Sequence, residues 1–318
     1  MRALVTGGAG FIGSTLVDRL LAEGHSVDVI DSLSSGKLSN LAEARSNRDH
    51  DLTFHQIDIR NAEVVTLIER RKPEVIFHLA AQADVRVSVS DPALDASINI
   101  LGGINVLEGA RRAETRKVVF ASSGGTIYGE PDPSSLPVTE AAPQRPESPY
   151  GVSKKVFTDY LVAYNTLYGL DFTSLALANV YGPRQDPHGE AGVVSIFAGR
   201  LLAGEPCTIF GDGTQTRDFV FVDDVVDAFV RAATRGDGIL FNIGTGREVS
   251  VNELYTSMAT AADVSEPAIY APARTGELDR ISLSAAKAAV HLGWESWTHL
   301  DAGTSAVIEW ARGEQSAP

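Results

Sequence analysis

The stretch Thr6-Gly7-Gly8-Ala9-Gly10-Phe11-Ile12-Gly13 decides the fold of this 318-residue chain. It joins an apolar run at residues 3–6, which predicts a strand, to a helical pattern at residues 11–23. Its glycines recur at every third position. Such a turn lets a pyrophosphate approach the free N–H groups and the positive dipole end of the following helix. The stretch therefore predicts a dinucleotide-binding loop.

Short apolar runs alternate with helical patterns outward from this loop. They predict further strands at residues 26–31, 52–57, 75–79, 117–121 and 172–178, and helices at residues 62–71, 85–114 and 150–168. Six prolines between residues 131 and 149 predict an irregular loop. Strands that alternate with helices indicate βαβ units. We expect an α/β fold, a Rossmann-type doubly wound parallel sheet with a smaller C-terminal α/β substrate-binding region.

Glycine- and proline-rich turns become frequent after residue 178, so the pattern predicts two regions. We expect residues 1–178 to form the dinucleotide-binding domain. Residues 219–244 are expected to return to it, because they contain a further predicted helix and strand. Residues 179–218 and 245–318 are expected to form the substrate-binding region.

The composition restricts the partners of this chain. Forty-one acidic and 27 basic residues give a formal charge of -14, which repels phosphate backbones, so we expect no nucleic-acid partner. The single cysteine excludes an intrachain disulfide, and the scattered histidines lack metal-ligand spacing, so we expect no metal. No apolar run reaches the roughly 18 residues of a membrane span, and no signal peptide is recognisable. We therefore expect a soluble, cytoplasmic protein with no membrane partner.

An acidic residue lies where the adenosine ribose of a dinucleotide would bind. Asp31 ends the second predicted strand, 18 residues after Gly13. A carboxylate there accepts hydrogen bonds from ribose hydroxyls and repels a 2′-phosphate, which favours NAD over NADP. No arginine follows before Gly36, although Lys37 comes next. The predicted cofactor is NAD.

A second motif, Ser148-Pro149-Tyr150-Gly151-Val152-Ser153-Lys154, has the form of a helix start. The serine can cap the helix, and proline suits its first position. Tyr150 and Lys154 are then neighbours on one helix face. A free phenol has a pKa of about 10, and a nearby ammonium with the positive nicotinamide ring would lower it. This pair is the candidate for acid–base catalysis.

These motifs resemble the extended branch of the short-chain dehydrogenase/reductase family, which acts on nucleotide sugars. The glycine loop, Asp58-Ile59, His78-Leu79-Ala80-Ala81-Gln82 and the Tyr150/Lys154 pair match that branch. The resemblance continues through Asn179-Val180-Tyr181-Gly182-Pro183-Arg184-Gln185, Phe210-Gly211-Asp212-Gly213, Thr216-Arg217-Asp218-Phe219-Val220 and Phe241-Asn242-Ile243-Gly244-Thr245-Gly246. It covers the chain from Met1 to about Trp294.

The resemblance implies which residues surround NAD. They are Gly7, Gly10, Phe11, Ile12, Gly13, Asp31, Ser32, Asp58, Ile59, Leu79, Ala80, Ala81, Gln82, Asn99, Ser122, Tyr150 and Lys154. In the same way, Tyr150 would take a proton from the sugar, and Lys154 would bind the nicotinamide ribose and lower the pKa of the tyrosine. A hydroxyl would hydrogen-bond the reacting oxygen. Ser123 is the first choice and Thr126 the second, because Gly124 stands where well-known relatives have a serine.

Residues 184–194 are similar to bacterial UDP-glucose 4-epimerases. This implies an NAD-dependent isomerase that interconverts UDP-glucose and UDP-galactose through a 4-keto sugar. Two alternatives stay open: a UDP-glucuronate 4-epimerase or decarboxylase on the same scaffold, and a non-catalytic NAD-sensing protein. Gly124-Gly125 occupies the place of the acid pair of related 4,6-dehydratases, which argues against elimination of water.

The substrate side also follows from the resemblance. The residues expected to contact a UDP-sugar are Arg86, Asn179, Val193, Thr208, Phe210, Arg217 and Arg274. Arg217 and Arg274 would grip the diphosphate, because guanidinium groups bind phosphate in a bidentate way. Arg86 would instead meet a substrate carboxylate, which keeps uronic acids open, and Ile281 would gate the room for an N-acetyl group. The resemblance also implies a homodimer through the helices at residues 85–114 and 150–168.

Overall fold

Seven strands form one parallel sheet in the order β11-β6-β5-β4-β1-β2-β3. The computed structural model describes residues 1–187, 192–273 and 278–316. The strands are β1 Arg2–Thr6, β2 Ser26–Asp31, β3 Leu52–Gln56, β4 Val75–His78, β5 Lys117–Ser123, β6 Asp171–Leu177 and β11 Ile239–Ile243. The predicted Rossmann-type doubly wound parallel sheet is thus confirmed, with strand ends close to those expected from the apolar runs.

The strand order reverses between β1 and β4, and this reversal positions the site. These two strands are neighbours in the sheet and end level with each other, with Thr6 opposite His78. The chain leaves β1 toward one side and β4 toward the other, so a crevice opens beyond their carboxyl ends. The glycine loop follows β1 at this crevice, as the sequence predicts.

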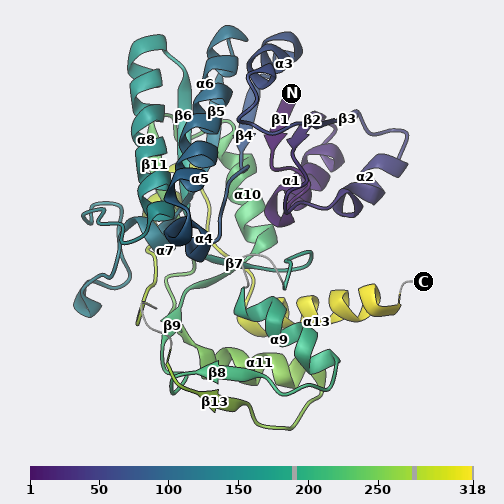
Figure 1. Ribbon diagram of the computed structural model, residues 1–318, viewed down its shortest axis with the longest axis vertical. Helices are drawn as coiled ribbons and strands as arrows, with labels where there is room; N and C mark the ends of the chain where they lie inside the picture. Colours follow the sequence, from purple (N-terminus) through teal and green to yellow (C-terminus); the bar gives the residue numbers. More distant parts are fainter. Residues whose placement is uncertain (188–191, 274–277, 317–318) are drawn as a thin grey trace.

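Helices cover both faces of the sheet (Figure 1). One face packs against α1 (Phe11–Ala22) and α10 (Val222–Ala232), and the other against α3 (Glu63–Arg71), α6 (Gly103–Arg112) and α8 (Pro149–Tyr168). The sequence of β1 is continuously apolar because both of its faces are buried. Val5 packs into the core beneath α1 and α10, and Leu4 packs into the core beneath α3, α6 and α8.

The predicted helix at residues 85–114 is interrupted, which corrects the sequence interpretation. The structure has α4 (Val85–Ser90), α5 (Pro92–Ala96), the π-helical segment η2 (Ser97–Gly102) and then α6. Pro92 disfavours helical geometry at the preceding residue, and Asp91 accordingly has φ -141° and ψ 77°. Asp91 then caps the new helix by accepting a hydrogen bond from the Leu94 N–H.

The helix α8 begins as the motif predicts. The Ser148 hydroxyl accepts a hydrogen bond from the Gly151 N–H at 3.1 Å, and Pro149 takes the first helical position. The helix ends at Gly169, which is left-handed at φ +68°. Tyr150 and Lys154 therefore lie in its first turns.

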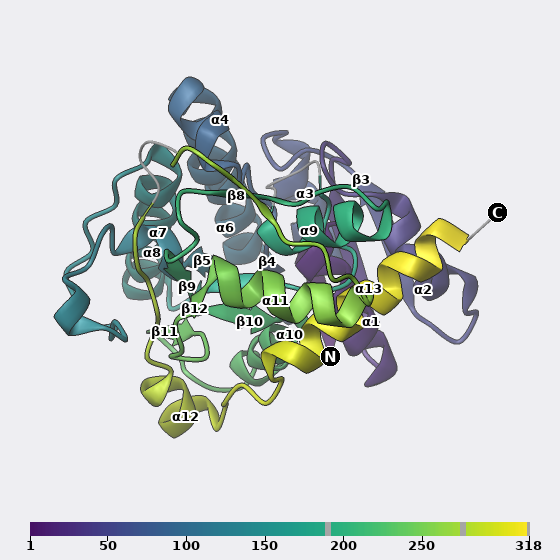
Figure 2. The same ribbon diagram turned by 90° about the horizontal axis from the view of Figure 1, so that it is seen from below.

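The second region is built from short pairs of strands and from helices. Its elements are β7 Asn179–Tyr181, α9 Val193–Leu202, β8 Thr208–Phe210, β9 Thr216–Arg217, β10 Phe219–Phe221, β12 Val249–Ser250, α11 Val251–Ala262, β13 Ile269–Ala271, α12 Ala286–Leu292 and α13 Leu300–Ser316. Helices α9, α11 and α13 pack together beneath the sheet (Figure 2). No helix in the described part of the chain is long and apolar enough to cross a membrane.

The remaining elements are short. They are η1 Leu38–Leu41, α2 Ala42–Ser46, α7 Gly124–Ile127 and η3 Pro133–Ser135. The proline-rich stretch up to Pro149 is irregular apart from η3, as expected. Helix α7, which follows β5 directly, was not predicted.

Candidate active site

Gly7, Gly10 and Gly13, in the loop after β1, have different roles. Gly7 has φ +72°, and a Cβ on it would lie 2.7 Å from the Ala80 nitrogen. A Cβ on Gly13 would collide with the Gly7 carbonyl oxygen. Gly7 and Gly13 are thus required for packing within the protein. A Cβ on Gly10 would meet only the Gly7 oxygen, at 3.2 Å, so this position leaves its backbone open to a ligand.

Asp31 ties the glycine loop to the loop after β2. Its carboxylate accepts hydrogen bonds from the Ala9 N–H at 2.9 Å and the Leu33 N–H at 2.8 Å. Each carboxylate oxygen retains acceptor capacity for a ribose hydroxyl. Lys37, which could have favoured a 2′-phosphate, forms an ion pair with Asp186 at 2.9 Å. The sequence did not predict this second task of Asp31.

The loop after β4 is held by reciprocal hydrogen bonds. The Gln82 N–H donates to Asn99 Oδ1 at 2.9 Å, and Asn99 Nδ2 donates to the Gln82 carbonyl oxygen at 2.8 Å. The Ala80 N–H donates to Thr6 Oγ1 at 3.2 Å. Leu79, Ala80, Ala81 and Gln82 are therefore fixed at the edge of the crevice.

The other predicted cofactor residues fall into two groups. Ile59 is buried in the core, so only its backbone can face a cofactor, and Phe11 and Ile12 pack partly against the other core. Asp58 is instead half-buried after β3, where the Arg60 guanidinium holds the pKa of its carboxylate below the usual range. Ser32 donates a hydrogen bond to Ser34 Oγ at 3.0 Å.

One further observation, at the end of β5, indicates that the crevice holds a dinucleotide. The Ser122 hydroxyl at the end of β5 is 3% exposed and has no hydrogen-bond partner within the described residues. A buried polar group left in this way costs about 1–3 kcal/mol, and a ligand that supplies the partner recovers it. Together with the open face of Gly10, this supports a bound cofactor between β1 and β5.

The Tyr150/Lys154 pair lies against the end of β5. Lys154 is buried, and its Nζ donates a 2.8 Å hydrogen bond to the Ala121 carbonyl oxygen. The same nitrogen lies 5.5 Å from the centre of the Tyr150 ring and 4.9 Å from that of Phe120. A buried ammonium beside a phenol favours the phenolate, as an acid–base tyrosine requires.

His78 lies beneath this pair as a buried neutral ring. Its Nδ1 is 2.7 Å from Thr6 Oγ1, and its ring packs against both Phe120 and Phe157, which also contact each other. Burial, assisted by the positive charge of Lys154, lowers the pKa of His78 to about 3. The ring is therefore uncharged at neutral pH and adds no second cation near Lys154.

The two candidate hydroxyls flank the start of α7. Ser123 precedes the helix and is half-buried, and Thr126 Oγ1 donates a long 3.4 Å hydrogen bond to the Ser123 carbonyl oxygen. A Cβ on Gly124 would collide with Leu283 Cδ1. A serine here would therefore require the Leu283 side chain to move.

The predicted substrate residues lie on the second region and on α4. Thr208 and Phe210 bound β8, Asn179 starts β7, and Val193 starts α9. Arg217 Nη1 donates to the carbonyl oxygens of Thr216 and Asp279, at 2.7 and 3.4 Å. Arg274 lies outside the described residues.

Two predicted specificity residues are engaged within the protein. The exposed Arg86 forms a bidentate ion pair with Asp84, with Nη2 2.7 Å from Oδ2. Ile281, expected to gate the sugar pocket, is buried in a small apolar cluster with Tyr128 and Val138. Its side chain therefore packs into the protein interior.

Asp218 is a structural residue that sequence reasoning did not single out. Its buried carboxylate accepts hydrogen bonds from the Thr245 N–H and hydroxyl, the Gly246 N–H and the Leu283 N–H. Burial raises the pKa of Asp218. In the sequence, Asp218 stands directly before the buried strand β10. Its hydrogen bonds join its own segment to residues 245–246 and to Leu283.

Comparison with known proteins defines the class. The model of the NAD dependent epimerase/dehydratase family matches residues 3–244. The chain belongs to this family, and its cofactor is NAD. The predicted resemblance to the extended short-chain dehydrogenase/reductases is thereby confirmed.

Individual relatives narrow the comparison. A UDP-glucose 4-epimerase of Mycolicibacterium smegmatis is 51% identical over 98% of this chain and 99% of its own length. The structure of a UDP-glucose 4-epimerase with UDP-glucose from Thermotoga maritima is similar at a TM-score of 0.95 and 44% identity, over 99% of this chain and 100% of that one. A UDP-glucose 4-epimerase of Thermus thermophilus in complex with NAD gives a TM-score of 0.90 and 43% identity, over 98% and 99% of the chains.

Proposed function

We propose that this protein is an NAD-dependent UDP-hexose 4-epimerase that interconverts UDP-glucose and UDP-galactose. The observation that carries the proposal is the position of Lys154. Its ammonium is buried at the end of β5 and lies beside the Tyr150 ring. The high identity to UDP-glucose 4-epimerases over the whole chain supports the substrate.

Tyr150 acts as the acid–base group in this proposal. Its phenolate accepts the proton of the sugar 4-hydroxyl and returns it after the 4-keto sugar has turned its other face. Bound NAD supplies the chemistry of removing hydrogen from C4 and giving it back. Lys154 favours the phenolate through its charge and positions the nicotinamide ribose.

A hydroxyl of the β5–α7 turn assists Tyr150. We place Ser123 first, because it ends β5 beside Ser122, whose hydroxyl has no partner among the described residues, and Thr126 second, because its hydroxyl is turned back to the Ser123 carbonyl oxygen. Either group would donate a hydrogen bond to the sugar oxygen that changes charge during the reaction.

The second region binds the UDP moiety. Residues 179–218 and 245–318 form this region, and residues 1–178 with 219–244 hold NAD. Arg217 and Arg274 grip the diphosphate, and Asn179 adds a hydrogen bond to it. Thr208 and Phe210 frame the uracil, and Val193 contributes from the start of α9.

The alternatives are less well supported by the residues. A UDP-glucuronate enzyme needs a cation for the substrate carboxylate, and the candidate Arg86 is already neutralised by Asp84. An NAD-sensing protein has no need for the buried Lys154 beside Tyr150. A dehydratase needs an acid pair after Ser123, and a side chain on Gly124 would collide with Leu283.

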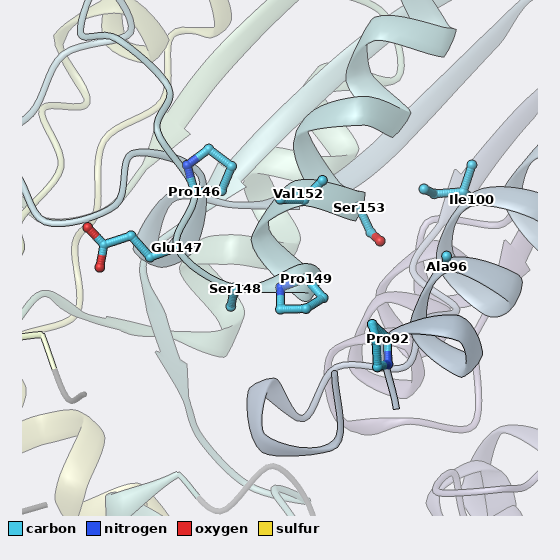
Figure 3. A pocket seen from close by; sticks show the side chains of 9 residues that line it. All are labelled: Pro92, Ala96, Ile100, Pro146, Glu147, Ser148, Pro149, Val152 and Ser153. Atoms are coloured by element: carbon cyan, nitrogen blue, oxygen red, sulfur yellow. The ribbon is translucent and has the colours of Figure 1, made fainter. Parts of the chain in front are cut away.

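We also propose a homodimer through α4–α6 and α8. Exposed apolar side chains gather on these helices and are Val85, Val89, Leu101, Val152, Tyr160, Val162, Leu167 and Tyr168. An open cavity of about 480 Å³ between α5 and the start of α8 adds apolar lining from Pro92, Ala96, Ile100 and Pro149 (Figure 3). Light scattering is expected to give twice the chain mass of 33.8 kDa, and a monomer for the Val89→Glu/Leu101→Glu variant.

Substrate choice is tested with a panel. Purified protein is incubated, without added NAD, with UDP-galactose, UDP-glucuronate or UDP-N-acetylglucosamine, and the products are resolved by anion-exchange chromatography. The proposal predicts conversion of UDP-galactose to UDP-glucose with the highest kcat/KM of the three. Faster epimerisation of UDP-glucuronate would favour the uronic acid alternative, and no turnover of any sugar would contradict an epimerase.

A further inference from the structure

Asp95 is a fully buried carboxylate near the catalytic helix. Its Oδ1 accepts hydrogen bonds from Gln82 Nε2 at 3.1 Å and from Asn99 Nδ2 at 2.9 Å, and its Oδ2 accepts one from Ser153 Oγ at 2.6 Å. All three partners, within the described residues, are neutral donors. Both carboxylate oxygens are thus engaged by side-chain hydrogen bonds.

Such an arrangement is costly to build. Removal of a carboxylate from water without an opposite charge is compensated only if each of its oxygens is well bonded. The bonds that Asp95 accepts are of the charge-assisted kind, about twice as strong as bonds between neutral groups. Three hydrogen bonds converge on this one side chain, so Asp95 holds its three partners in a fixed arrangement.

The three donors come from the segments that must be aligned for catalysis. Gln82 belongs to the loop after β4, and Asn99 to the π-helical segment η2. Ser153 lies between Tyr150 and Lys154 on α8 and points across the gap toward the helix that carries Ala96 and Ile100 (Figure 3). Asp95 therefore joins the proposed cofactor loop to the proposed catalytic helix through a single group.

Both polar atoms of the Gln82 side-chain amide form hydrogen bonds. While its Nε2 donates to Asp95, the Asp84 N–H donates to its Oε1 at 2.7 Å. Asn99 is locked in the same way by the Gln82 backbone. A displacement of α8 would strain the Ser153 bond, because that hydroxyl donates directly from α8 to Asp95.

We propose that Asp95 is a positioning residue for the 4-epimerase reaction. Through Ser153 it fixes the first two turns of α8, and through Gln82 and Asn99 it fixes the loop that borders NAD. The distance between the Tyr150 hydroxyl and the cofactor is thereby set by one buried carboxylate. This inference rests on the proposed function for the identity of the reacting groups.

The test compares Asp95→Ala, Asp95→Asn and Ser153→Ala with the wild-type holoenzyme. Asp95→Ala and Ser153→Ala are expected to lower kcat for UDP-galactose by about 10- to 100-fold, with KM within about twofold, because misplacement mainly affects the chemical step. The double variant Asp95→Ala/Ser153→Ala should be no slower than the slower of the two single variants, because both substitutions break the same hydrogen bond between Asp95 and Ser153. Asp95→Asn keeps an acceptor for the two amides and can donate to Ser153, so it should regain most of the lost kcat.

A second readout does not depend on turnover. The rate at which bound NAD leaves the protein is expected to rise about tenfold in Asp95→Ala, because Gln82 and Asn99 lose their anchor. If wild-type protein did not epimerise UDP-galactose, the proposed function would fail, while this rate would still test the role of Asp95. An unchanged NAD dissociation rate in Asp95→Ala would overturn the inference.

Asp91→Ala is the matched control. Asp91 caps the same short helix but contacts neither Ser153 nor Gln82 in the described structure. It is expected to lower the unfolding midpoint and leave kcat within about twofold. Loss of kcat in Asp91→Ala equal to that in Asp95→Ala, or a wild-type kcat in Ser153→Ala, would contradict a positioning role.

Discussion

The Lys154 ammonium lies 5.5 Å from the centre of the Tyr150 ring while it donates a 2.8 Å hydrogen bond to the Ala121 carbonyl oxygen. Lys154 is thus anchored to the last residues of β5 and is not a surface side chain beside a tyrosine. The carboxyl end of β5 therefore determines where the Lys154 charge lies relative to the Tyr150 phenol.

Lys154→Met is expected to lower kcat by about 100-fold or more and to shift the acid side of the pH–rate profile to higher pH. Loss of the ammonium disfavours the phenolate form of Tyr150. Steady-state rates between pH 5 and pH 10 are the measurement, with Lys155→Met, whose lysine is on the same helix and paired with Asp159, as the control. A rate loss with no change in the shape of the profile would contradict the electrostatic role.

Gly124 and Leu283 are expected to depend on each other. Gly124→Ser should destabilise the protein by about 1–3 kcal/mol, because the new Cβ meets Leu283 Cδ1. Leu283→Ala should cost about 2–5 kcal/mol, because its side chain is buried. Urea unfolding of the double variant should show less destabilisation than the sum of the two. Additive losses would show that the two positions do not compete for space.

His78 is expected to make the protein acid-sensitive. The pKa of His78 is lowered from 6.5 to about 3 in the folded state, so between these values only the unfolded chain binds the proton. Stability is therefore lost as pH falls below 6.5, by at most about 1.4 kcal/mol per pH unit.

The variant His78→Asn isolates this effect. Asparagine keeps a polar group toward Thr6 but does not titrate, so the variant should be less stable than wild type at pH 7 and lose less stability on acidification. Free energies of unfolding at pH 7, 6 and 5 should show the gap between the two proteins narrowing. A constant gap would mean that His78 contributes nothing to the pH dependence.

Asp218→Asn is expected to destabilise the protein by about 2–4 kcal/mol. The carboxylate accepts from four donors, and an amide would direct its own N–H groups at some of them. Denaturant unfolding measures the loss, and the matched position is the exposed Asp212, whose carboxylate accepts from the Thr214 N–H and hydroxyl. Asp212→Asn should change stability by less than about 1 kcal/mol, and an equal loss at both positions would contradict the account.

The sequence predicted what depends on neighbours in the chain. The glycine loop and the start of α8 were found because a turn and a capped helix are encoded within a few residues. The parallel sheet followed because apolar runs that alternate with helical patterns indicate βαβ units. The break at Asp91 was signalled by Pro92 but overlooked in favour of a long helical pattern.

The rest depends on residues far apart in the sequence. Nothing in the sequence distinguishes Asp95 and Asp218 from other acidic residues, because most of their hydrogen-bond donors are distant in the chain and reach them only in the folded protein. Gly124 looked like a departure from a motif until Leu283 was found in the space beside it. Ile281 looked like a pocket residue, and the structure buries it in a cluster with Ile127, Tyr128, Val138, Ala176 and Leu283, most of which are far from it in the sequence.

The central claim is that Tyr150 is the acid–base group of an NAD-dependent 4-epimerase. The most direct test incubates Tyr150→Phe and wild type with UDP-galactose without added NAD and measures UDP-glucose formed and NAD bound. The account predicts conversion by wild type, a loss of at least about 1,000-fold in the variant, and equal NAD content in both. Conversion by Tyr150→Phe at a rate near that of wild type would contradict it.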